Sequence, residues 1–296
     1  MWNILTKQFY RQRKDFEDSC VGRDAGLTFP EGVICSTDIA YADDGIKAHM
    51  LDIYRPEDSQ EKILPVIINV HGGGLIIGNK EFNRYFCALL CKKGFLVYCI
   101  EYRLIPDCLM YDQISDVFMA MDYIKERLAA DGGDSSHVYM AGDSGGACLI
   151  TYANAIQNST NIARAANVTP SGLRINALGL ISGMFYTSRF DKIGLFLPKY
   201  LYGRDYKKTS FAKYVNPENR ELLNSLAPVW LVTSHNDFLR RYTTDFEKAL
   251  TRAEREHELV AFPKNKKLTH AFSVFEPFLP ESSAVIDMMV EYLRKF

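Results

Sequence analysis

A serine surrounded by glycines marks the place in the chain where chemistry is expected. The stretch Gly142-Asp143-Ser144-Gly145-Gly146 matches G-x-S-x-G, the pattern of a sharp strand-to-helix turn that exposes a serine hydroxyl. Residues 138–141 favour a short strand before the turn, and residues 147–156 favour a helix of small residues after it. Small neighbours suit a tight, strained turn, and a helix N-terminus favours negative charge. Ser144 is therefore a candidate nucleophile that needs a base, an orienting acid and donors to an oxyanion.

A run of three glycines, His71-Gly72-Gly73-Gly74, precedes this serine by about 70 residues. Glycines lack a Cβ atom, so their backbone N–H groups can approach a ligand closely. H-G-G-G after a buried strand is the oxyanion-hole motif of many lipases and esterases, and the residue after the nucleophile supplies the second donor. Both motifs follow predicted strands, which indicates a single site for acyl transfer.

Five stretches of the chain, taken in order, resemble the motifs of one enzyme family. They are His71–Gly74, Tyr102–Pro106, Gly142–Gly146, Asp237–Arg240 and Thr269–Phe272. Over about residues 33–296 the chain resembles the hormone-sensitive-lipase-type esterases of the α/β-hydrolase family. Three positions depart from that pattern: Gly145 replaces an alanine, Ala271 replaces a glycine, and Arg241 stands where a second acid is common. None of the three is a catalytic group, and the change at Gly145 is expected to be harmless because only its N–H is needed.

The resemblance implies a catalytic triad of Ser144, Asp237 and His270, in the family's chain order. A neutral imidazole at His270 would accept the serine proton as the oxygen attacks an acyl carbon. Asp237 would hold the ring in the correct tautomer and stabilise the imidazolium. These three residues are therefore the expected nucleophile, acid and base.

The oxyanion would be bound by the backbone N–H groups of Gly73, Gly74 and Gly145, each contributing on the order of 3 kcal/mol in the transition state. His71 and Gly72 complete the glycine motif and are expected to shape its loop. Asp143, beside the serine, is expected to be a structural hydrogen-bonding group rather than a participant.

Other ionisable residues are weaker candidates for these roles. His137 and His257 lie at the starts of predicted strands, at the wrong edge of the sheet. His235, two residues from Asp237, is a rival base, and Asp245, inside a predicted helix, is a rival acid. On another predicted helix, Asp116 and Asp122 are expected to be solvated, while Tyr102 and Arg103 are expected to organise loops near the site.

The elements that must position these residues alternate between strands and helices. Near-continuous apolar runs, typical of strands buried on both faces, occupy residues 66–70, 95–100, 138–141, 175–181, 229–233 and 258–262. Residues 33–41 and 47–54 predict a hairpin, and helical patterns such as 112–130 separate the later strands. This order predicts an α/β fold with a mostly parallel, doubly wound sheet of about eight strands. The resemblance makes it an α/β-hydrolase fold, with the triad at the carboxyl edge of the sheet.

One interval between predicted strands is too long for a simple helical connection. Residues 183–224 form an insertion with nine aromatic side chains, which could make a sugar-stacking or acyl-binding surface or only a small core of their own. Residues 1–30 predict one or two short amphipathic helices. We expect one domain, residues 1–296, with a helical lid formed by about 1–30 and 183–224, because such insertions usually cover the carboxyl edge of a sheet.

The composition excludes several classes of partner. The net charge is −1, with 47% hydrophobic and 24% charged residues, which gives no electrostatic reason to expect nucleic acid or an anionic membrane. The start lacks the apolar region of a signal peptide, and no stretch approaches the roughly 18 apolar residues of a membrane span. A cytoplasmic protein is expected. The seven cysteines form no C-x-x-C pair and are expected to be small buried hydrophobes, with no metal and no cofactor.

The sequence thus predicts a serine carboxylesterase whose partner is a small-molecule ester. An acyl-Ser144 intermediate and short acyl chains are expected, with acetyl esters of small molecules or sugars as the substrates. An acylaminopeptidase or lactonase using the same triad remains an alternative, as does a hydrolase homologue that only binds a ligand. Whether the chain forms a homodimer is left open.

Overall fold

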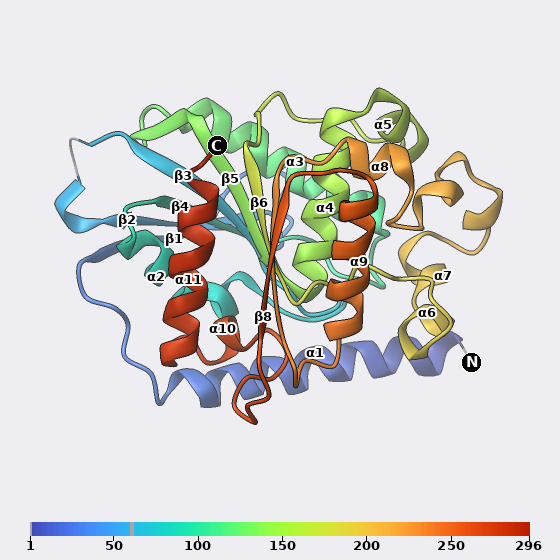
Figure 1. Ribbon diagram of the computed structural model, residues 1–296, viewed down its shortest axis with the longest axis horizontal. Coiled ribbons are helices and arrows are strands. Elements are labelled where there is room, and N and C mark those ends of the chain that lie inside the picture. The colour runs from blue at the N-terminus through green and yellow to red at the C-terminus, as the bar shows by residue number, and fades with distance from the viewer. Residues whose placement is uncertain (1, 60–61) are drawn as a thin grey trace.

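A computed structural model describes residues 2–59 and 62–296, and its centre is a sheet of eight described strands (Figure 1). The strands are β1 Val33–Ala40, β2 Met50–Pro56, β3 Leu64–Val70, β4 Leu96–Ile100, β5 Gly133–Asp143, β6 Ala177–Ile181, β7 Val229–Ser234 and β8 His257–Phe262. Their order across the sheet is β1-β2-β4-β3-β5-β6-β7-β8. The pairs β1/β2 and β2/β4 are antiparallel and every other pair is parallel. The predicted α/β-hydrolase fold with a mostly parallel sheet is confirmed.

Helices connect and cover the strands. They are α1 Trp2–Asp24, α2 Arg84–Lys92, α3 Met110–Arg127, α4 Ser144–Asn158, α5 Thr160–Ala166, α6 Lys192–Phe196, α7 Pro198–Leu201, α8 Arg220–Asn224, α9 Arg240–Arg252, α10 Phe272–Phe275 and α11 Pro280–Leu293. Short 3-10 turns occur at η1 Glu57–Ser59, η2 Lys80–Asn83, η3 Tyr206–Lys208 and η4 Ser210–Tyr214. Within the described ranges, no helix combines the length and the apolar character needed to cross a membrane.

Alternation along β3 explains why its sequence is apolar at every position but Asn69. Val66, Ile68 and Val70 belong to the core cluster that includes residues of α3, α4 and α9. Ile67 belongs to the second core cluster, which α2 and α11 complete. Successive side chains of a strand point to opposite faces of the sheet, so a strand covered on both faces is apolar at nearly every position. The buried polar exception, Asn69, accepts a hydrogen bond from Asn83 at 3.0 Å.

Several elements differ in extent from those that the sequence predicted. Residues 2–24 form the single helix α1 instead of one or two short ones. Strand β5 begins at Gly133 rather than near residue 138, because its polar first half pairs with the start of β3 at an exposed end of the sheet. The predicted hairpin is present as β1 and β2, with Ala40 opposite Met50. Polar residues at an exposed strand end give no hydrophobic signal, which is why the extension was missed.

The two segments predicted to form a lid lie against each other and against the body. In Figure 1 α1 runs along the bottom of the view, past α10 and toward α6. Phe9 of α1 meets Tyr200 of α7 with ring centroids 5.1 Å apart, and Phe16 meets Phe82 at 4.8 Å. Residues 183–224 contain only short helices and turns between β6 and β7. That these segments act as a lid stays a prediction.

Six of the nine aromatic side chains in residues 183–224 are buried: Phe185, Tyr186, Tyr200, Tyr202, Phe211 and Tyr214. Tyr202 packs against Phe211 and Tyr206, and the hydroxyl of Tyr202 is 2.8 Å from that of Thr187. Most of this aromatic set is therefore a core that holds the insertion to the body. Phe190 and Phe196 are the exposed members.

Candidate active site

Ser144 lies at the point where β5 ends and α4 begins. Its φ angle is +48°, in the left-handed region that non-glycine residues rarely adopt. A Cβ atom on Gly146 would lie less than 3 Å from the backbone oxygens of Val70 and His71, so only glycine fits at that position. The tight, strained turn that the glycine pattern predicts is present. Strain of this kind is retained where the surroundings impose it, commonly at functional sites.

A chain of hydrogen bonds joins Ser144, His270 and Asp237. The Nε2 atom of His270 is 2.9 Å from the Oγ atom of Ser144, and its Nδ1 atom is 2.7 Å from Oδ1 of Asp237. Asp237 follows β7 and His270 follows β8, so the carboxyl ends of three parallel strands bring the residues together. A carboxylate only accepts hydrogen bonds, so Nδ1 carries the hydrogen and Nε2 is free to accept the serine proton.

The surroundings of Asp237 hold it as an anion. Burial alone would raise its pKa, but the hydrogen bond and charge of His270 outweigh burial and lower the pKa below its usual value. The hydroxyl of Thr233 donates to Oδ2 at 2.9 Å, and the backbone N–H of Leu239 donates to Oδ1 at 2.8 Å. These donors leave the carboxylate a single orientation in which to meet the ring.

The residue after His270 explains one departure from the family pattern. Ala271 has a φ angle of +48°, a conformation in which glycine carries no steric penalty. Its backbone N–H donates to the Oγ atom of Ser182 at 3.1 Å, which holds the turn in place. Alanine therefore adopts the conformation that glycine would take, at a cost on the order of 1 kcal/mol.

The glycine run forms a loop that touches the start of α4. Gly73 and Gly74 have φ angles of +105° and +62°. A Cβ atom on Gly145 would lie 2.9 Å from the backbone nitrogen of Gly74 and 2.8 Å from that of Leu75. The missing Cβ at Gly145 thus lets the loop approach more closely than alanine would, which the sequence alone did not indicate. Backbone N–H groups from both segments are gathered beside Ser144.

Side chains from distant segments hold this loop, residues 72–79, in place. Oδ1 of Asp143 accepts from the backbone N–H of Gly72 and from Nδ2 of Asn83, both at 3.0 Å. From α1, Nε of Arg13 donates to the carbonyl of Ile76 at 2.8 Å. The role of Arg13 was not predicted, because nothing in an amphipathic helix marks which arginine will reach a loop 63 residues away.

His71 is held as a buried cation under the same loop. Its Nε2 atom is 2.9 Å from Oε1 of Glu101, and its Nδ1 atom is 2.8 Å from the carbonyl of Gly72. Both partners are acceptors, so both ring nitrogens must donate. Burial alone would lower the pKa of His71, but the charge and hydrogen bond of Glu101 outweigh it and raise the pKa. Glu101 also accepts from the backbone N–H of Lys80 at 2.9 Å, which ties both ends of the loop together.

Ser144 opens into an apolar cavity of about 400 Å³. Most of its lining is large and apolar: Phe9, Phe16, Ile76, Ile77, Phe82, Met184, Ile193, Phe196, Leu197, Phe238, Leu239 and Phe275. Apart from His270, the lining residues that the structure describes include two charged side chains, Asp143 and Lys192. Phe9 and Phe16 come from α1, while Lys192 to Leu197 come from α6 and the residue after it. A ligand bound at Ser144 would therefore be enclosed mainly by hydrocarbon.

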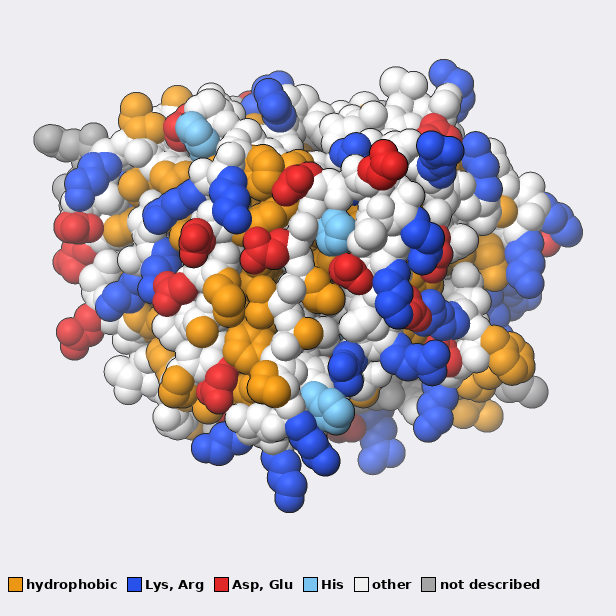
Figure 2. All heavy atoms as spheres, in the orientation of Figure 1, with side chains coloured by type: hydrophobic (Ala, Val, Ile, Leu, Met, Phe, Trp, Pro, Cys, Tyr) orange, Lys and Arg blue, Asp and Glu red, His pale blue; other side chains and the backbone are white. Residues whose placement is uncertain are grey.

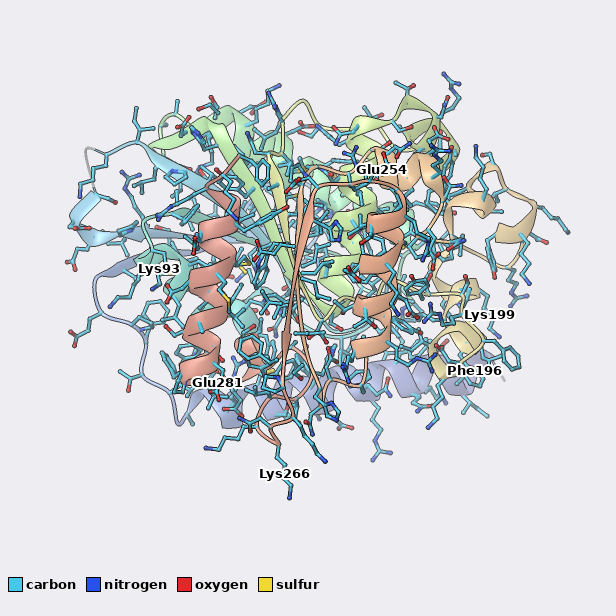
Figure 3. The ribbon with its side chains drawn as sticks, in the orientation of Figure 1. Lys93, Phe196, Lys199, Glu254, Lys266 and Glu281 are labelled. Carbon is cyan, nitrogen blue, oxygen red and sulfur yellow. The ribbon has the colours of Figure 1, made fainter. Side chains whose placement is uncertain are left out.

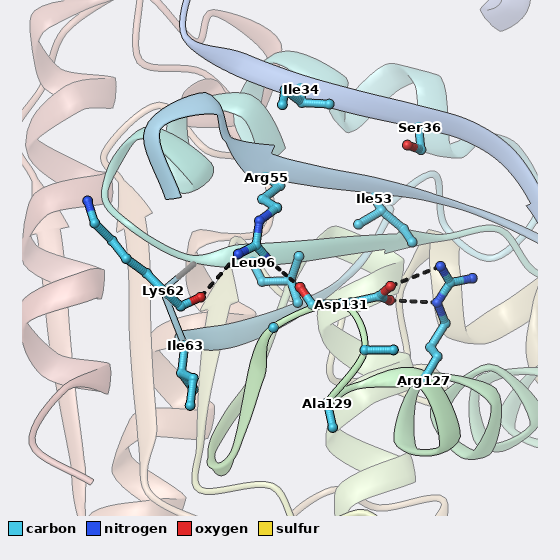
Figure 4. A pocket seen from close by; sticks show the side chains of 12 residues that line it. Ile34, Ser36, Ile53, Arg55, Lys62, Ile63, Leu96, Arg127, Ala129 and Asp131 are labelled. Atoms are coloured by element: carbon cyan, nitrogen blue, oxygen red, sulfur yellow. Dashed lines mark hydrogen bonds and ion pairs between the residues drawn. The ribbon is translucent and has the colours of Figure 1, made fainter. Parts of the chain in front are cut away.

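A larger cavity, of about 510 Å³, lies elsewhere and shares no lining residue with that of Ser144 (Figure 4). It contains the ion pair of Arg127 with Asp131, and Arg55 donates there to the carbonyl of Lys62. No serine, histidine and carboxylate are brought together in it. Size alone therefore does not mark the reactive site.

The rival residues lie apart from this arrangement. His235 is exposed and its Nδ1 atom accepts from Arg240 at 3.1 Å. Asp245 pairs with Arg189 at 2.8 Å. Asp122 is exposed as expected, but the expectation for Asp116 was wrong, since it is fully buried.

Asp116 is buried beside a cation, Arg103, and a histidine ring that come from other parts of the chain. Arg103 donates to its Oδ1 atom at 2.6 Å, and Nε2 of His49 lies 3.1 Å from the same atom. Helical periodicity placed Asp116 on a polar face, and the partners that cover that face come from elsewhere in the chain. Arg103 does organise a loop, because its backbone N–H also donates to Asp116.

Other chemistry-bearing groups are dispersed in the described part of the chain. Five of the seven cysteines are buried, two are half-buried, and all seven are free thiols. Among residues 2–59 and 62–296, no three His, Cys, Asp or Glu side chains are grouped so that they could hold a metal ion.

The sheet, the strained serine turn and the adjoining glycine loop define the chain as an α/β hydrolase in architecture. Comparison with protein families agrees: the family described as alpha/beta hydrolase fold matches residues 67–273, and the chain belongs to that family. Among curated relatives, it is 30% identical over 184 residues to the probable isoprenylcysteine alpha-carbonyl methylesterase ICME of Oryza sativa subsp. japonica, covering 58% of this chain and 44% of that protein. It is 32% identical over 120 residues to esterase LipQ of Mycobacterium tuberculosis, covering 40% of this chain and 28% of that protein. The chain thus spans less than half the length of these relatives.

Solved structures resemble the fold over nearly the whole chain. Esterase B from Lactobacillus rhamnosis superposes with a TM-score of 0.92 at 22% identity, over 99% of this chain and 95% of that one. The esterase from Pyrobaculum calidifontis gives a TM-score of 0.70 at 20% identity, over 97% and 93%. At these identities the similarity shows the fold alone.

The close approach at Gly145 leads to a first prediction. In Gly145→Ala, the added Cβ must push the glycine loop away, because backbone atoms lie within 3.0 Å of its position. Gly145 is a predicted oxyanion donor, and displacing its N–H should lower kcat by about tenfold or more with KM little changed. Gly22→Ala in α1, where the new Cβ meets nothing within 4 Å, is the matched control and should leave kcat unchanged. A wild-type kcat in Gly145→Ala would contradict a close-contact role for this glycine.

The pair of His71 and Glu101 predicts a pH-dependent stability. Because the pKa of His71 is raised in the folded state, the stabilisation is complete below the unfolded pKa of about 6.5 and is lost as the pH rises through the folded pKa. Glu101→Gln should therefore cost about 2 kcal/mol in the free energy of unfolding near pH 6 and less near pH 9. Denaturant melts at both pH values measure this difference.

The control for that experiment is Glu258→Gln, which removes an exposed carboxylate 3.5 Å from Lys295. Its cost should be small and should show no comparable trend between the two pH values. A cost for Glu101→Gln that is equal at both pH values would rule out a charged His71 as the source of the stability.

Proposed function

We propose that this protein is a serine hydrolase that cleaves carboxylic esters through an acyl-Ser144 intermediate. The hydrogen-bonded chain from Ser144 through His270 to Asp237 carries the proposal. The glycine loop beside it and the apolar cavity in front of it supply the other parts that ester cleavage needs. The relatives named as a methylesterase and an esterase support ester bonds over amide bonds.

In the first half of the reaction, Ser144 attacks the acyl carbon while Nε2 of His270 removes the hydroxyl proton. The carbonyl oxygen becomes an oxyanion, which accepts hydrogen bonds from the backbone N–H groups of Gly73, Gly74 and Gly145. Asp237 stabilises the imidazolium through its Nδ1 hydrogen. The imidazolium then donates its Nε2 proton to the ester oxygen, the C–O bond breaks, and the alcohol leaves.

In the second half, water takes the place of the alcohol. Nε2 of His270 removes a proton from the water as its oxygen attacks the acyl carbon, and the same donors hold the second oxyanion. The intermediate collapses by breaking its bond to Oγ, which regains the proton from His270. The carboxylic acid leaves and the enzyme returns to its starting state.

The cavity supports esters of small, apolar molecules as substrates, with short acyl chains such as acetyl. A volume of about 400 Å³ is at the small end for ligand sites, and aromatic and aliphatic side chains form most of its wall. Sugar esters, the other class expected, would meet few polar partners in this lining. We also propose that α1 and residues 183–224 act as a lid, since Phe9, Phe16 and Phe196 enclose the cavity. A cytoplasmic location and a homodimer remain predictions.

Substitution of the triad tests the proposed mechanism. Ser144→Ala and His270→Ala should each lower kcat on p-nitrophenyl acetate by roughly 10⁴-fold or more, and the double variant should be little worse, because the triad acts as a unit. A fluorophosphonate should label wild-type Ser144 once, as read by mass spectrometry of the peptide.

His235→Ala is the matched control, because this exposed histidine lies two residues from Asp237 and its ring is hydrogen-bonded to Arg240 rather than to Ser144 or Asp237. It should retain nearly all activity. A larger loss of activity in His235→Ala than in His270→Ala would overturn the assignment of His270 as the base. If correctly folded wild type turned over no ester, the esterase proposal would fall and the alternative of a homologue that only binds a ligand would stand.

A substrate panel tests the proposed specificity. The ratio kcat/KM should be highest for p-nitrophenyl esters of short acyl chains and should fall toward decanoate, because the cavity encloses about 400 Å³. Acetylated sugars should be poorer than acetates of apolar alcohols. Faster cleavage of a lactone or an N-acyl peptide than of any ester would favour the alternative activities of the same triad.

A further inference from the structure

A basic and aromatic segment lies beside the mouth of the cavity. Residues 189–208 contain six lysines and arginines but only two aspartates, although the whole chain has a net charge of −1. Three large apolar side chains of the same segment are exposed: Phe190 at 91%, Leu195 at 54% and Phe196 at 55%. We call Phe190, Leu195 and Phe196, together with the basic residues of 189–208, the α6 surface.

The members of the α6 surface adjoin one another and the cavity. Phe190 and Leu195 line one shallow hollow together with Lys199 and Lys207. Phe196 lines the cavity of Ser144, as does Phe238, which is 72% exposed and meets the ring of His270 at 4.3 Å. Figure 3 shows Phe196 and Lys199 on the same outer corner, and Figure 2 shows apolar side chains there beside basic ones. The rim of the active-site cavity is thus apolar and continuous with a basic outer surface.

The acidic residues of the segment do not neutralise it. The carboxylate of Asp191 accepts from the backbone N–H groups of Ile193 and Gly194, and from the hydroxyl of Tyr242 at 2.6 Å. Asp205 pairs with Lys208 at 2.8 Å. The ammonium group of Lys192, at the cavity rim, forms no ion pair with any residue that the structure describes. Arg189 is paired with Asp245 of α9 at 2.8 Å, but the other five basic residues of the segment still outnumber its two aspartates. The α6 surface therefore presents a net positive charge around its exposed apolar side chains.

We propose that the α6 surface docks the protein onto an anionic lipid surface. Phe190, Leu195 and Phe196 would enter the region between the headgroups and the acyl chains, while the neighbouring lysines meet lipid phosphates. Lysine stems suit this position because they lie along apolar surface while their ammonium groups stay in water. The mouth of the cavity would then face the lipid, so an ester dissolved there could reach Ser144 without crossing water. Delivery of an ester rests on the proposed function, whereas the docking itself does not.

Charge distinguishes this partner from a second copy of the chain. Two α6 surfaces facing each other would bring two positive regions together, which opposes association. An anionic lipid surface offers the complementary charge and an apolar layer in the same geometry. Single exposed apolar residues are common on proteins, but here three of them share one basic rim next to a reactive serine.

Vesicle binding by the full chain tests the proposal. Wild type should co-sediment with vesicles of phosphatidylcholine and phosphatidylglycerol at least tenfold more strongly than with phosphatidylcholine alone, and less strongly as salt is raised. Phe190→Ser with Leu195→Ser should lower the partition coefficient on the anionic vesicles about tenfold. Lys207→Glu with Lys208→Glu should lower it by a similar factor. Neither double variant changes a residue of the cavity, so turnover of a soluble ester should stay as in wild type.

Ile63→Ser and Lys62→Glu are the matched controls. Ile63 is 75% exposed, and both residues line the separate cavity of Figure 4. Both variants should bind anionic vesicles as wild type does. Equal binding by the α6 variants and wild type, or no preference of wild type for anionic vesicles, would overturn the proposal. So would a dimer that the α6 variants dissociate while vesicle binding is unchanged.

The same experiment tests ester cleavage and vesicle binding independently. Ser144→Ala should bind vesicles as wild type does, whatever its activity. If wild type docks on anionic vesicles but cleaves no ester, the docking stands and the esterase proposal falls. If soluble esters are cleaved and no anionic vesicle is bound, the esterase proposal stands and the docking proposal falls.

Discussion

Close approach between two loops at the carboxyl edge of the sheet is the constraint on which the rest of the site depends. The end of β3 and its glycine loop lie against the turn from β5 into α4, so closely that side chains are excluded at several points. Gly72, Gly145 and Gly146 each lack a Cβ that would fall within 3 Å of the opposing segment. This contact places the backbone N–H groups of one loop beside the serine of the other, and the strained φ angle of Ser144 is part of the same junction. Donors to an oxyanion are effective only when they are held in place before charge develops, and this contact between backbones would hold the predicted donors in that way.

Buried and half-buried polar side chains hold that junction in place. Asp143 holds Gly72, and the pair of Glu101 with His71 joins the start of the loop to Lys80 at its end. Arg13 reaches the same loop from α1, so the helix that lines the cavity also braces the glycine loop. A change at α1 can therefore alter the reactive geometry as well as access to the cavity. Burying a charge is costly unless it is paired, which is why each of these groups has its partners in place.

The net charge of the whole chain does not reveal how charge is distributed along it. The net charge of −1 gave no reason to expect an anionic lipid as a partner, yet residues 189–208 carry most of their charge with one sign. Burial also divides the aromatic side chains of residues 183–224: six of them form a core, whereas Phe190 and Phe196 are exposed beside the cavity. Composition alone could not separate these two groups, because both have the same residue types and lie in the same segment.

The sequence by itself determined the strand order along the chain, the serine turn, the glycine run and the positions of Asp237 and His270 after their strands. These features follow from local rules, since strand alternation, glycine-dependent turns and motif order are all encoded in neighbouring residues. Only the tertiary structure decided that Asp116 is buried, that Gly145 admits the glycine loop more closely than alanine would, and that Arg13 braces that loop. Each of these depends on residues far apart in sequence, and their contacts are set by how the layers pack rather than by any local pattern.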